Sequence, residues 1–153
     1  MDETYVINQL KEDTCFVSTD FERDMTEAQR RGKENNISVD YVLPDFTSIR
    51  RGYIRSQNDP NNGEQVIRMN NERFAVPELL FRPSDLGIQQ MGIAEAIVHV
   101  ISNFPTEVQS HLYQNILLTG GSCSFPNCQE RVENEVRMLA PAQCEVRVTR
   151  ATK

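Results

Sequence analysis

Hydrophobic positions near the N-terminus recur at the spacing of amphipathic helices. Val6, Ile7 and Leu10 fall on one side of a first helix. A second helix is predicted over residues 21–31, and it should end at Gly32, because glycine readily adopts the left-handed backbone that closes a helix. The chain therefore begins with two short helices.

An extended pattern follows these helices. Polar and apolar residues alternate over 38–43, which is typical of a half-buried strand, and a second extended run covers 65–69. Between them, residues 56–64 (SQNDPNNGE) are rich in Asn, Asp, Pro and Gly, as loops are. We expect the two strands to form a hairpin with a long, mobile connection.

The second half of the chain opens with a helical stripe and continues with a strand, a helix and a strand. The stripe predicts a helix with one buried face, and Pro105 should end this helix. The residues of the stripe are Ile93, Ile97, Val100, Ile101 and Phe104. The continuous apolar run at 116–119 predicts a strand buried on both faces of a parallel sheet.

A last helix and strand complete the pattern. The helix has Pro126 in its first turn and Pro141 after its end, and its apolar positions are Val132, Val136, Leu139 and Ala140. Residues 144–148 alternate like one more strand, and the polar residues 149–153 should fray. This order of elements predicts an α/β fold of mixed character.

Composition and charge place the chain among soluble globular proteins. Its 153 residues suit one domain or part of a larger one, and 39% of them are hydrophobic. A net charge of -6 argues against a general nucleic-acid or membrane-surface binder, since either needs a basic face. The chain has no apolar run of about 18 residues and begins with acidic residues, so we expect an intracellular protein.

The four cysteines favour buried free thiols over a metal centre. Cys123 and Cys128 have a spacing that zinc sites use, but no second pair accompanies them, because Cys15 and Cys144 are isolated. The two histidines also lie apart, and His99 beside the apolar stripe is interpreted as a boundary or core residue. A zinc-binding module built on Cys123 and Cys128 remains an alternative hypothesis.

The stretch NILLTGGSCSFPNC at 115–128 carries the main candidate site. A strand that runs into Gly120 and Gly121 before a helix can let a ligand approach the backbone, and the N-terminus of a helix attracts phosphate. It lacks the Lys and Ser/Thr of the phosphate loop and the G-x-G-x-x-G spacing. On spacing alone, a tight turn is the favoured interpretation, and no arrangement of residues predicts an enzyme.

Two longer stretches resemble the actin family. NERFAVPELLFRPSDLGIQQMGIAEAI (71–97) and NILLTGGSCSFPNCQERVENEVRMLAP (115–141) are similar to actin segments in order and in motif. The resemblance implies a partial actin-like ATPase fold of the ribonuclease H-like type, a remnant of the subdomain 3/4 lobe. Residues 1–75 would form part of the outer small subdomain, residues 76–150 part of the inner subdomain, and residues 151–153 a divergent tail.

The resemblance also implies a use for the glycine turn. In actins, ATP lies in a cleft between two halves, and the matching turn backs the adenosine end of the nucleotide. A Lys-Glu pair contacts the base and ribose there, although such charges are also typical of an exposed helix end. The implied nucleotide-binding residues are Lys11, Glu12, Gly120, Gly121, Ser122 and Phe125.

Several departures from the family pattern predict that this site is vestigial. Ser124 replaces an apolar methionine, Ser122 replaces a threonine, and Asn127 replaces a glycine, although asparagine tolerates a left-handed backbone. The phosphate-binding hairpins and catalytic residues of the family precede the matched region. We therefore expect no catalytic residue, no metal and no cofactor in this chain, whereas a full-length parent could hold ATP.

Within the family, the chain is most similar to actin-related members that serve in the nucleus. The resemblance implies a truncated form of a non-catalytic subunit or scaffold of a chromatin-remodelling, histone-variant-exchange complex. Its partners would be protein subunits and, indirectly, histones, without direct nucleic-acid or membrane contact, in the nucleus or alternatively the cytoplasm. The alternative function is an ATP-binding, actin-like cytoskeletal protein. An unpaired sheet edge should also leave the chain marginally stable.

Overall fold

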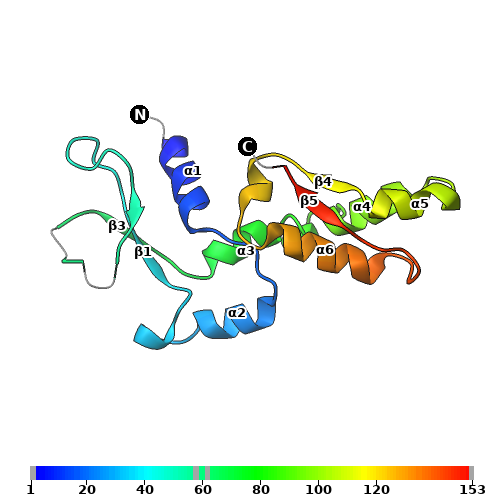
Figure 1. The fold of residues 1–153 in the computed structure, drawn as a ribbon. Helices are drawn as coiled ribbons and strands as arrows, with labels where there is room; N and C mark the ends of the chain where they lie inside the picture. Colours follow the sequence, from blue (N-terminus) through cyan, green and yellow to red (C-terminus); the bar gives the residue numbers. More distant parts are fainter. Residues whose placement is uncertain (1–2, 57–58, 61–62, 152–153) are drawn as a thin grey trace. The chain divides into compact units, whose positions relative to one another are not determined.

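The computed structural model describes residues 3–56, 59–60 and 63–151, and the chain divides into two compact units (Figure 1). Unit 1 comprises Met1–Cys15 and Asp20–Val76, and unit 2 comprises Phe16–Thr19 and Pro77–Lys153. Each unit is described by itself. Part of the connection predicted at 56–64, residues 57–58 and 61–62, lies outside the described residues.

The helices of unit 1 agree with the sequence pattern in position but not in every detail. The first, α1 (Glu3–Thr14), buries Leu10 as predicted but leaves Ile7 53% exposed. The second, α2 (Phe21–Ala28), begins where the Asp20 carboxylate accepts a hydrogen bond from the backbone N–H of Arg23 at 3.1 Å.

Helix α2 ends at Ala28, before the predicted end at residue 31. The carbonyl oxygen of Ala28 accepts hydrogen bonds from the side-chain amides of Asn35 and Asn70, at 3.0 and 2.9 Å, which satisfies it outside the helix. Gly32 does adopt the left-handed backbone, with φ 63°, but it begins the short 3-10 helix η1 (Gly32–Glu34).

A three-stranded antiparallel sheet forms the rest of unit 1. Strands β1 (Val39–Val42) and β3 (Val66–Met69) pair as predicted, with Tyr41 opposite Ile67. A third strand, β2 (Tyr53–Ile54), pairs with the other edge of β1, so the order is β2-β1-β3. Two residues are too few to show an alternating pattern, which is why the sequence does not predict β2.

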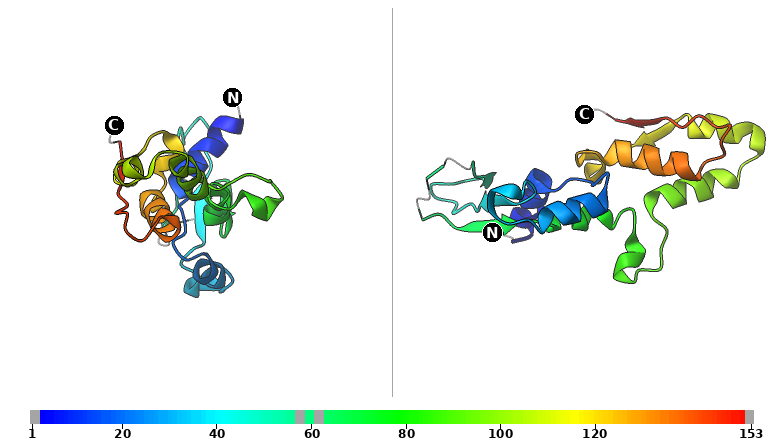
Figure 2. Two further views of the ribbon diagram at one scale, coloured as in Figure 1. Left: turned by 90° about the vertical axis from the view of Figure 1, so that its right-hand side faces the viewer. Right: turned by 90° about the horizontal axis from the view of Figure 1, so that it is seen from below.

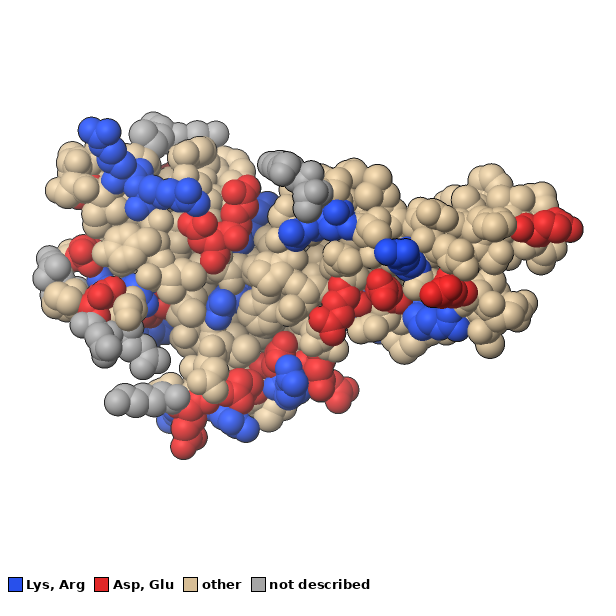
Figure 3. Space-filling model, in the orientation of Figure 1, with Lys and Arg blue, Asp and Glu red and all other residues tan. Residues whose placement is uncertain are grey.

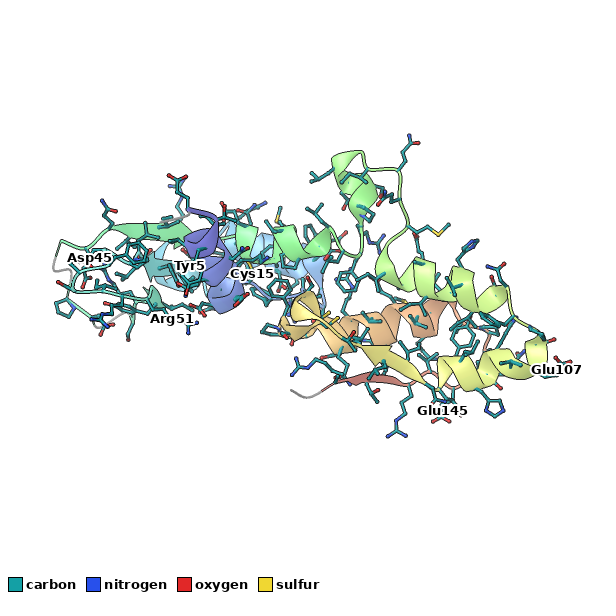
Figure 4. All side chains as sticks on the ribbon, turned by 90° about the horizontal axis from the view of Figure 1, so that it is seen from above. Tyr5, Cys15, Asp45, Arg51, Glu107 and Glu145 are labelled. Atoms are coloured by element: carbon teal, nitrogen blue, oxygen red, sulfur yellow. The ribbon has the colours of Figure 1, made fainter. Side chains whose placement is uncertain are left out.

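Tyr41 connects this sheet to α1. Its buried hydroxyl donates a hydrogen bond to Asp13 at 3.0 Å, and burial together with that bond raises the pKa of Tyr41 to about 12. Arg51, labelled in Figure 4, also pairs with Asp13, at 2.9 Å. Gly52 lies under the ring, and a Cβ there would come within 2.4 Å of Tyr41 Cε1, so only glycine fits.

Arg73 of α3 (Glu72–Glu78) holds the loops of unit 1. Its guanidinium donates hydrogen bonds to the carbonyl oxygens of Thr14 and Ile37. The next residue, Phe74, is fully buried, and its ring meets Phe21 edge to face with the centroids 5.4 Å apart. One turn of α3 therefore anchors α1, α2 and the segment that leads into β1.

Unit 2 packs helices against a two-stranded parallel sheet. Its central helix, α6, contacts both α4 and β5, and the segment around η2 projects from the unit (Figure 2). Strands β4 and β5 pair with Ile116 opposite Val148. The elements in chain order are η2 (Pro83–Leu86), α4 (Ile93–Ser102), α5 (Thr106–Tyr113), β4 (Ile116–Leu118), η3 (Gly121–Ser124), α6 (Cys128–Leu139) and β5 (Val148–Arg150).

The prediction for unit 2 is wrong in several places. Pro105 does close a helix, but it also precedes α5, which the sequence pattern does not predict. Strand β4 is buried on one face only, because Leu117 is 62% exposed. In the predicted helical stripe, Val100 and Phe104 are exposed. His99, expected at a boundary or in the core, is exposed as well.

The last strand is displaced toward the C-terminus. Cys144, Val146 and Val148 are buried in alternation, as predicted, but the paired strand β5 begins only at Val148 and includes Thr149 and Arg150. These last two residues, expected to fray, pair with β4. Residues 152–153 lie outside the described part of the chain.

A buried arginine organises unit 2. The guanidinium of Arg131 donates to the carboxylate of Glu78 at 2.7 Å and to that of Glu135 at 2.6 Å. It also donates to the carbonyl oxygen of Ser18 and lies 4.9 Å from the ring centroid of Phe81. Arg131 therefore joins α6 to the end of α3 and to the isolated segment 16–19.

Main-chain contacts reinforce the attachment of this segment. The N–H of Val17 donates to the carbonyl oxygen of Pro126 at 3.0 Å, and the side-chain amide of Asn127 donates to the carbonyl oxygen of Val17 at 3.2 Å. Val17 and Ser18 are fully buried. The start of α6 and segment 16–19 thus form one packed structure within unit 2.

Charge is unevenly spread over the surface. Acidic side chains gather over α2, where Glu22 is exposed in the first turn (Figure 3). No helix in the described part of the chain is long and apolar enough to cross a membrane.

Replacing Arg131 by methionine should strongly destabilise unit 2. Among the described residues, the change leaves the buried Glu78 carboxylate with only the long 4.0 Å ion pair to the exposed Arg82, which costs about 3 kcal/mol in the free energy of unfolding. The control is Arg68→Met, which breaks an ion pair of the same 2.7 Å length with Asp40 on the surface and should cause no measurable loss. Urea unfolding of both variants checks this, and equal losses would contradict the role given to Arg131.

Candidate functional site

The glycine turn between β4 and α6 is built on an unusual backbone conformation at Gly120. Its φ of 100° and ψ of 168° are open to glycine and strained for any residue with a side chain. The chain then forms the single 3-10 turn η3, and the N–H of Phe125 closes it on the carbonyl oxygen of Ser122. Gly120 thereby redirects the chain from the strand toward the helix.

Gly121 is exposed, and the fold does not require glycine at this position. Its φ lies outside the left-handed region, and a Cβ built there would meet no atom within 4 Å. The backbone of this residue is therefore open to approach from solvent. Such an opening is what a ligand needs if it is to contact the main chain closely.

The turn ends at a left-handed asparagine. Asn127 has φ 66°, which confirms the expectation that asparagine takes the left-handed backbone at this position. Helix α6 begins directly after it, at Cys128. Pro126 therefore precedes the helix. The sequence pattern wrongly places this proline in the first helical turn.

A shallow depression of about 460 Å³ adjoins the turn. It combines an aromatic wall with two carboxylates and one guanidinium, and its lining residues are Phe125, Pro126, Asn127, Cys128, Gln129, Glu130, Glu133, Asn134 and Arg150. Glu133 accepts a hydrogen bond from the N–H of Val148 at 3.1 Å, which ties the depression to β5. Its two carboxylates repel anionic groups, and Arg150 offsets one of them.

The six predicted nucleotide-binding residues fall into two groups. Gly120, Gly121, Ser122 and Phe125 share the turn in unit 2, where Ser122 is exposed and Phe125 is buried. Lys11 and Glu12 occupy consecutive positions near the end of α1 in unit 1, with Glu12 exposed. Binding of a nucleotide by these residues stays a prediction.

Sequence reasoning missed the charged side of the depression. Arg150 belongs to the stretch predicted to fray, and it enters the site because β5 extends to that residue. Glu130 and Glu133 lie one turn apart on α6, and their spacing indicates a shared helical face. The only sequence signal for Arg150 is the alternation of residues 144–148. A strand continued from these residues to Arg150 would have placed it beside Glu130 and Glu133.

The two cysteines of the turn differ in burial, since Cys123 is half-buried and Cys128 is buried. The thiol of Cys123 donates to the carbonyl oxygen of Thr119 at 3.3 Å, and Cys128 is buried. Burial, followed by the charge and hydrogen bond of Cys123, raises the pKa of Cys128 to about 11. In the part of the chain that the structure describes, no three His, Cys, Asp or Glu residues are grouped to hold a metal ion, so the zinc module gains no support.

Comparisons with known proteins agree on one family. The Actin family model matches residues 1–153. Actin-related protein 6 of Drosophila melanogaster is 46% identical over 95% of this chain, and Actin-like protein C08B11.6 of Caenorhabditis elegans is 44% identical over 97% of it. Actin-related protein 6 of Arabidopsis thaliana is 39% identical over 97% of it. The chain spans 37%, 36% and 41% of these relatives.

The two glycines of the turn should respond differently to alanine. Gly120→Ala forces a side chain into a strained backbone and should lower the free energy of unfolding by about 2 kcal/mol. Gly121→Ala places its methyl group in open space and should leave stability unchanged or slightly raised. Chemical denaturation measures both variants, and a larger loss for Gly121→Ala would show that the turn has another structure.

Proposed function

Because the chain belongs to the actin family, we propose that it is a non-catalytic subunit or scaffold of a nuclear chromatin-remodelling complex that exchanges a histone variant. The observation that carries the proposal is the 46% identity with an Actin-related protein 6 across 95% of the chain. The chain spans 37% of that relative, so the activity and partners of the whole protein belong to the proposal.

Within the family fold, the chain would correspond to the subdomain 3/4 lobe. Residues 1–75, with their small sheet and helices, would form part of the outer subdomain, and residues 76–150 part of the inner subdomain. The strand–turn–helix arrangement of β4, η3 and α6 supports the second assignment, since it carries the motif on which the resemblance depends.

The glycine turn would be one wall of a vestigial adenosine site. The open backbone at Gly121 and the aromatic wall at Phe125 support contact with a base. The depression beside them carries Glu130 and Glu133, which repel phosphate, and Ser124 supplies little apolar surface. ATP would bind weakly, so the chain would act without a cofactor.

Apolar side chains on unit 2 offer contact surface to protein partners. Leu117 of β4 is 62% exposed and Met138 of α6 is 76% exposed, and β4 pairs with one strand only among the described residues. Side chains of this kind are covered in protein interfaces. Subunits of the remodelling complex would cover them in the nucleus, and histones would be contacted indirectly.

Association with the remodelling complex is the direct test. A tagged chain expressed in cells should recover the remodelling ATPase and the exchanged histone variant from nuclear extract. Leu117→Asp puts a charge on the exposed strand face and should reduce this recovery at least about tenfold, a loss of about 1.4 kcal/mol. The control is Glu145→Lys, a charge change in the loop before β5 on the outside of unit 2 (Figure 4), which should recover both proteins normally.

Nucleotide titration separates the proposal from its alternative. Calorimetry with magnesium ATP should give a Kd of about 1 mM or weaker, because the site offers an adenosine wall beside two carboxylates. Micromolar binding, together with sedimentation of the chain with actin filaments and no recovery of the remodelling ATPase, would overturn the proposal. That result would favour an actin-like cytoskeletal protein.

A further inference from the structure

The loop between β1 and β2 exposes an aromatic side chain and an arginine. It comprises residues 45–51, and its two ends, Asp45 and Arg51, are labelled in Figure 4. We propose that the 45–51 loop is a docking surface for an acidic segment of a partner protein, in which an apolar side chain covers Phe46 and a carboxylate pairs with Arg50. This surface belongs to unit 1, whereas the proposed function places partner contacts on unit 2.

Hydrogen bonds within the loop fix its backbone. One oxygen of the Asp45 carboxylate accepts from three consecutive backbone N–H groups, those of residues 47–49, at 2.8, 2.9 and 2.7 Å. The carbonyl oxygen of Ile49 in turn accepts from the N–H groups of Asp45 and Phe46, at 3.1 and 3.0 Å. The bond from Ile49, followed by that from Thr47, lowers the pKa of Asp45. A loop that is held in this way loses little entropy when a partner binds.

Phe46 combines a strained backbone with an exposed side chain. Its φ of 61° lies in the left-handed region, which is uncommon for a bulky residue because the side chain crowds the main chain. Burial compensates for this strain only in part, since Phe46 is 39% exposed. Strained residues are concentrated at functional positions, and a partner that covers the ring would remove its remaining apolar surface from water.

The charges around the loop select an acidic partner. Arg50 is exposed and forms no ion pair with any residue that the structure describes. The nearby carboxylates are already engaged, because Asp45 accepts the N–H groups of its own loop and Asp13 accepts from Arg51 and Tyr41. A carboxylate matches a guanidinium with two parallel hydrogen bonds. Arginine and aromatic residues are also the usual hot spots of protein interfaces.

A protein segment suits this surface better than a nucleic acid does. Binding to a phosphate backbone uses several cations at once, whereas only Arg50 of the two arginines in the loop is free of an ion pair to a described residue. The net charge of -6 on the chain also repels a nucleic acid. The occupant is therefore a protein segment that carries Asp or Glu next to an aliphatic or aromatic residue.

Selection of random peptides on the full chain tests this surface. A phage-displayed library is bound to the immobilised chain, and the selected peptides are measured by fluorescence polarisation. We expect them to carry Asp or Glu beside an aliphatic or aromatic residue. Phe46→Asn and Arg50→Glu should each weaken their binding about tenfold or more, as changes at interface hot spots do. Selection on the Arg50→Glu chain should instead enrich peptides with Lys or Arg in place of the acidic residue.

Matched changes in unit 2 serve as controls. Phe104→Asn removes an aromatic ring that is 47% exposed, and Arg147→Glu reverses an exposed charge, so neither should weaken the peptides. Asparagine tolerates the left-handed backbone better than phenylalanine does. Phe46→Asn should therefore leave the free energy of unfolding in urea unchanged or raised, although it weakens peptide binding.

The proposal is overturned if the selection yields no acidic peptides, or if the selected peptides bind Phe46→Asn and Arg50→Glu as tightly as the unchanged chain. Binding of a DNA duplex that is lost in Arg50→Glu would make the loop a nucleic-acid surface instead. A loss of stability in Phe46→Asn with unchanged peptide binding would make Phe46 a packing residue.

Discussion

A single guanidinium, that of Arg131, holds unit 2 together. It is buried between the carboxylates of Glu78 and Glu135, the carbonyl oxygen of Ser18 and the ring of Phe81. Removing so many charged groups from water is costly, and the folded state recovers this cost only when every donor is paired. Because its partners come from three separate stretches of sequence, the interaction can form only when all three are in place.

The geometry of the candidate site follows from this interaction. Segment 16–19 lies against the start of α6 through the contacts of Val17 with Pro126 and Asn127, and these residues end the glycine turn. Gly120 sets the other end of the turn through its backbone conformation. The turn is thus fixed at both ends, and the backbone of Gly121 between them is open to solvent.

The sequence predicts where the helices and strands lie better than it predicts which of their apolar residues are buried. Alternation locates β1 and β3, and helical spacing locates α4 and α6, because these periods belong to the backbone itself. The same patterns misjudge Ile7, Val100 and Leu117, which are apolar but exposed. A pattern shows which face of an element is apolar, and only tertiary packing decides whether another element covers it.

For the candidate site, the sequence likewise predicts the local features and misses the long-range contacts. The resemblance finds the glycine turn and the left-handed Asn127, since both depend on local backbone conformation. The pairing of Arg131 with Glu78, 53 positions away, has no local pattern and could not be predicted. Arg150 enters the depression only because β5 pairs beyond the residues that alternate.

Amide hydrogen exchange at Val17 tests most directly whether segment 16–19 and α6 form one structure. The N–H of Val17 is bonded to the carbonyl oxygen of Pro126, so it should open only when α6 opens. Native-state exchange should give Val17 the same free energy of opening as the amides of Val132 and Val136. Exchange of Val17 near the rate of an unfolded peptide, with α6 still protected, would contradict the account.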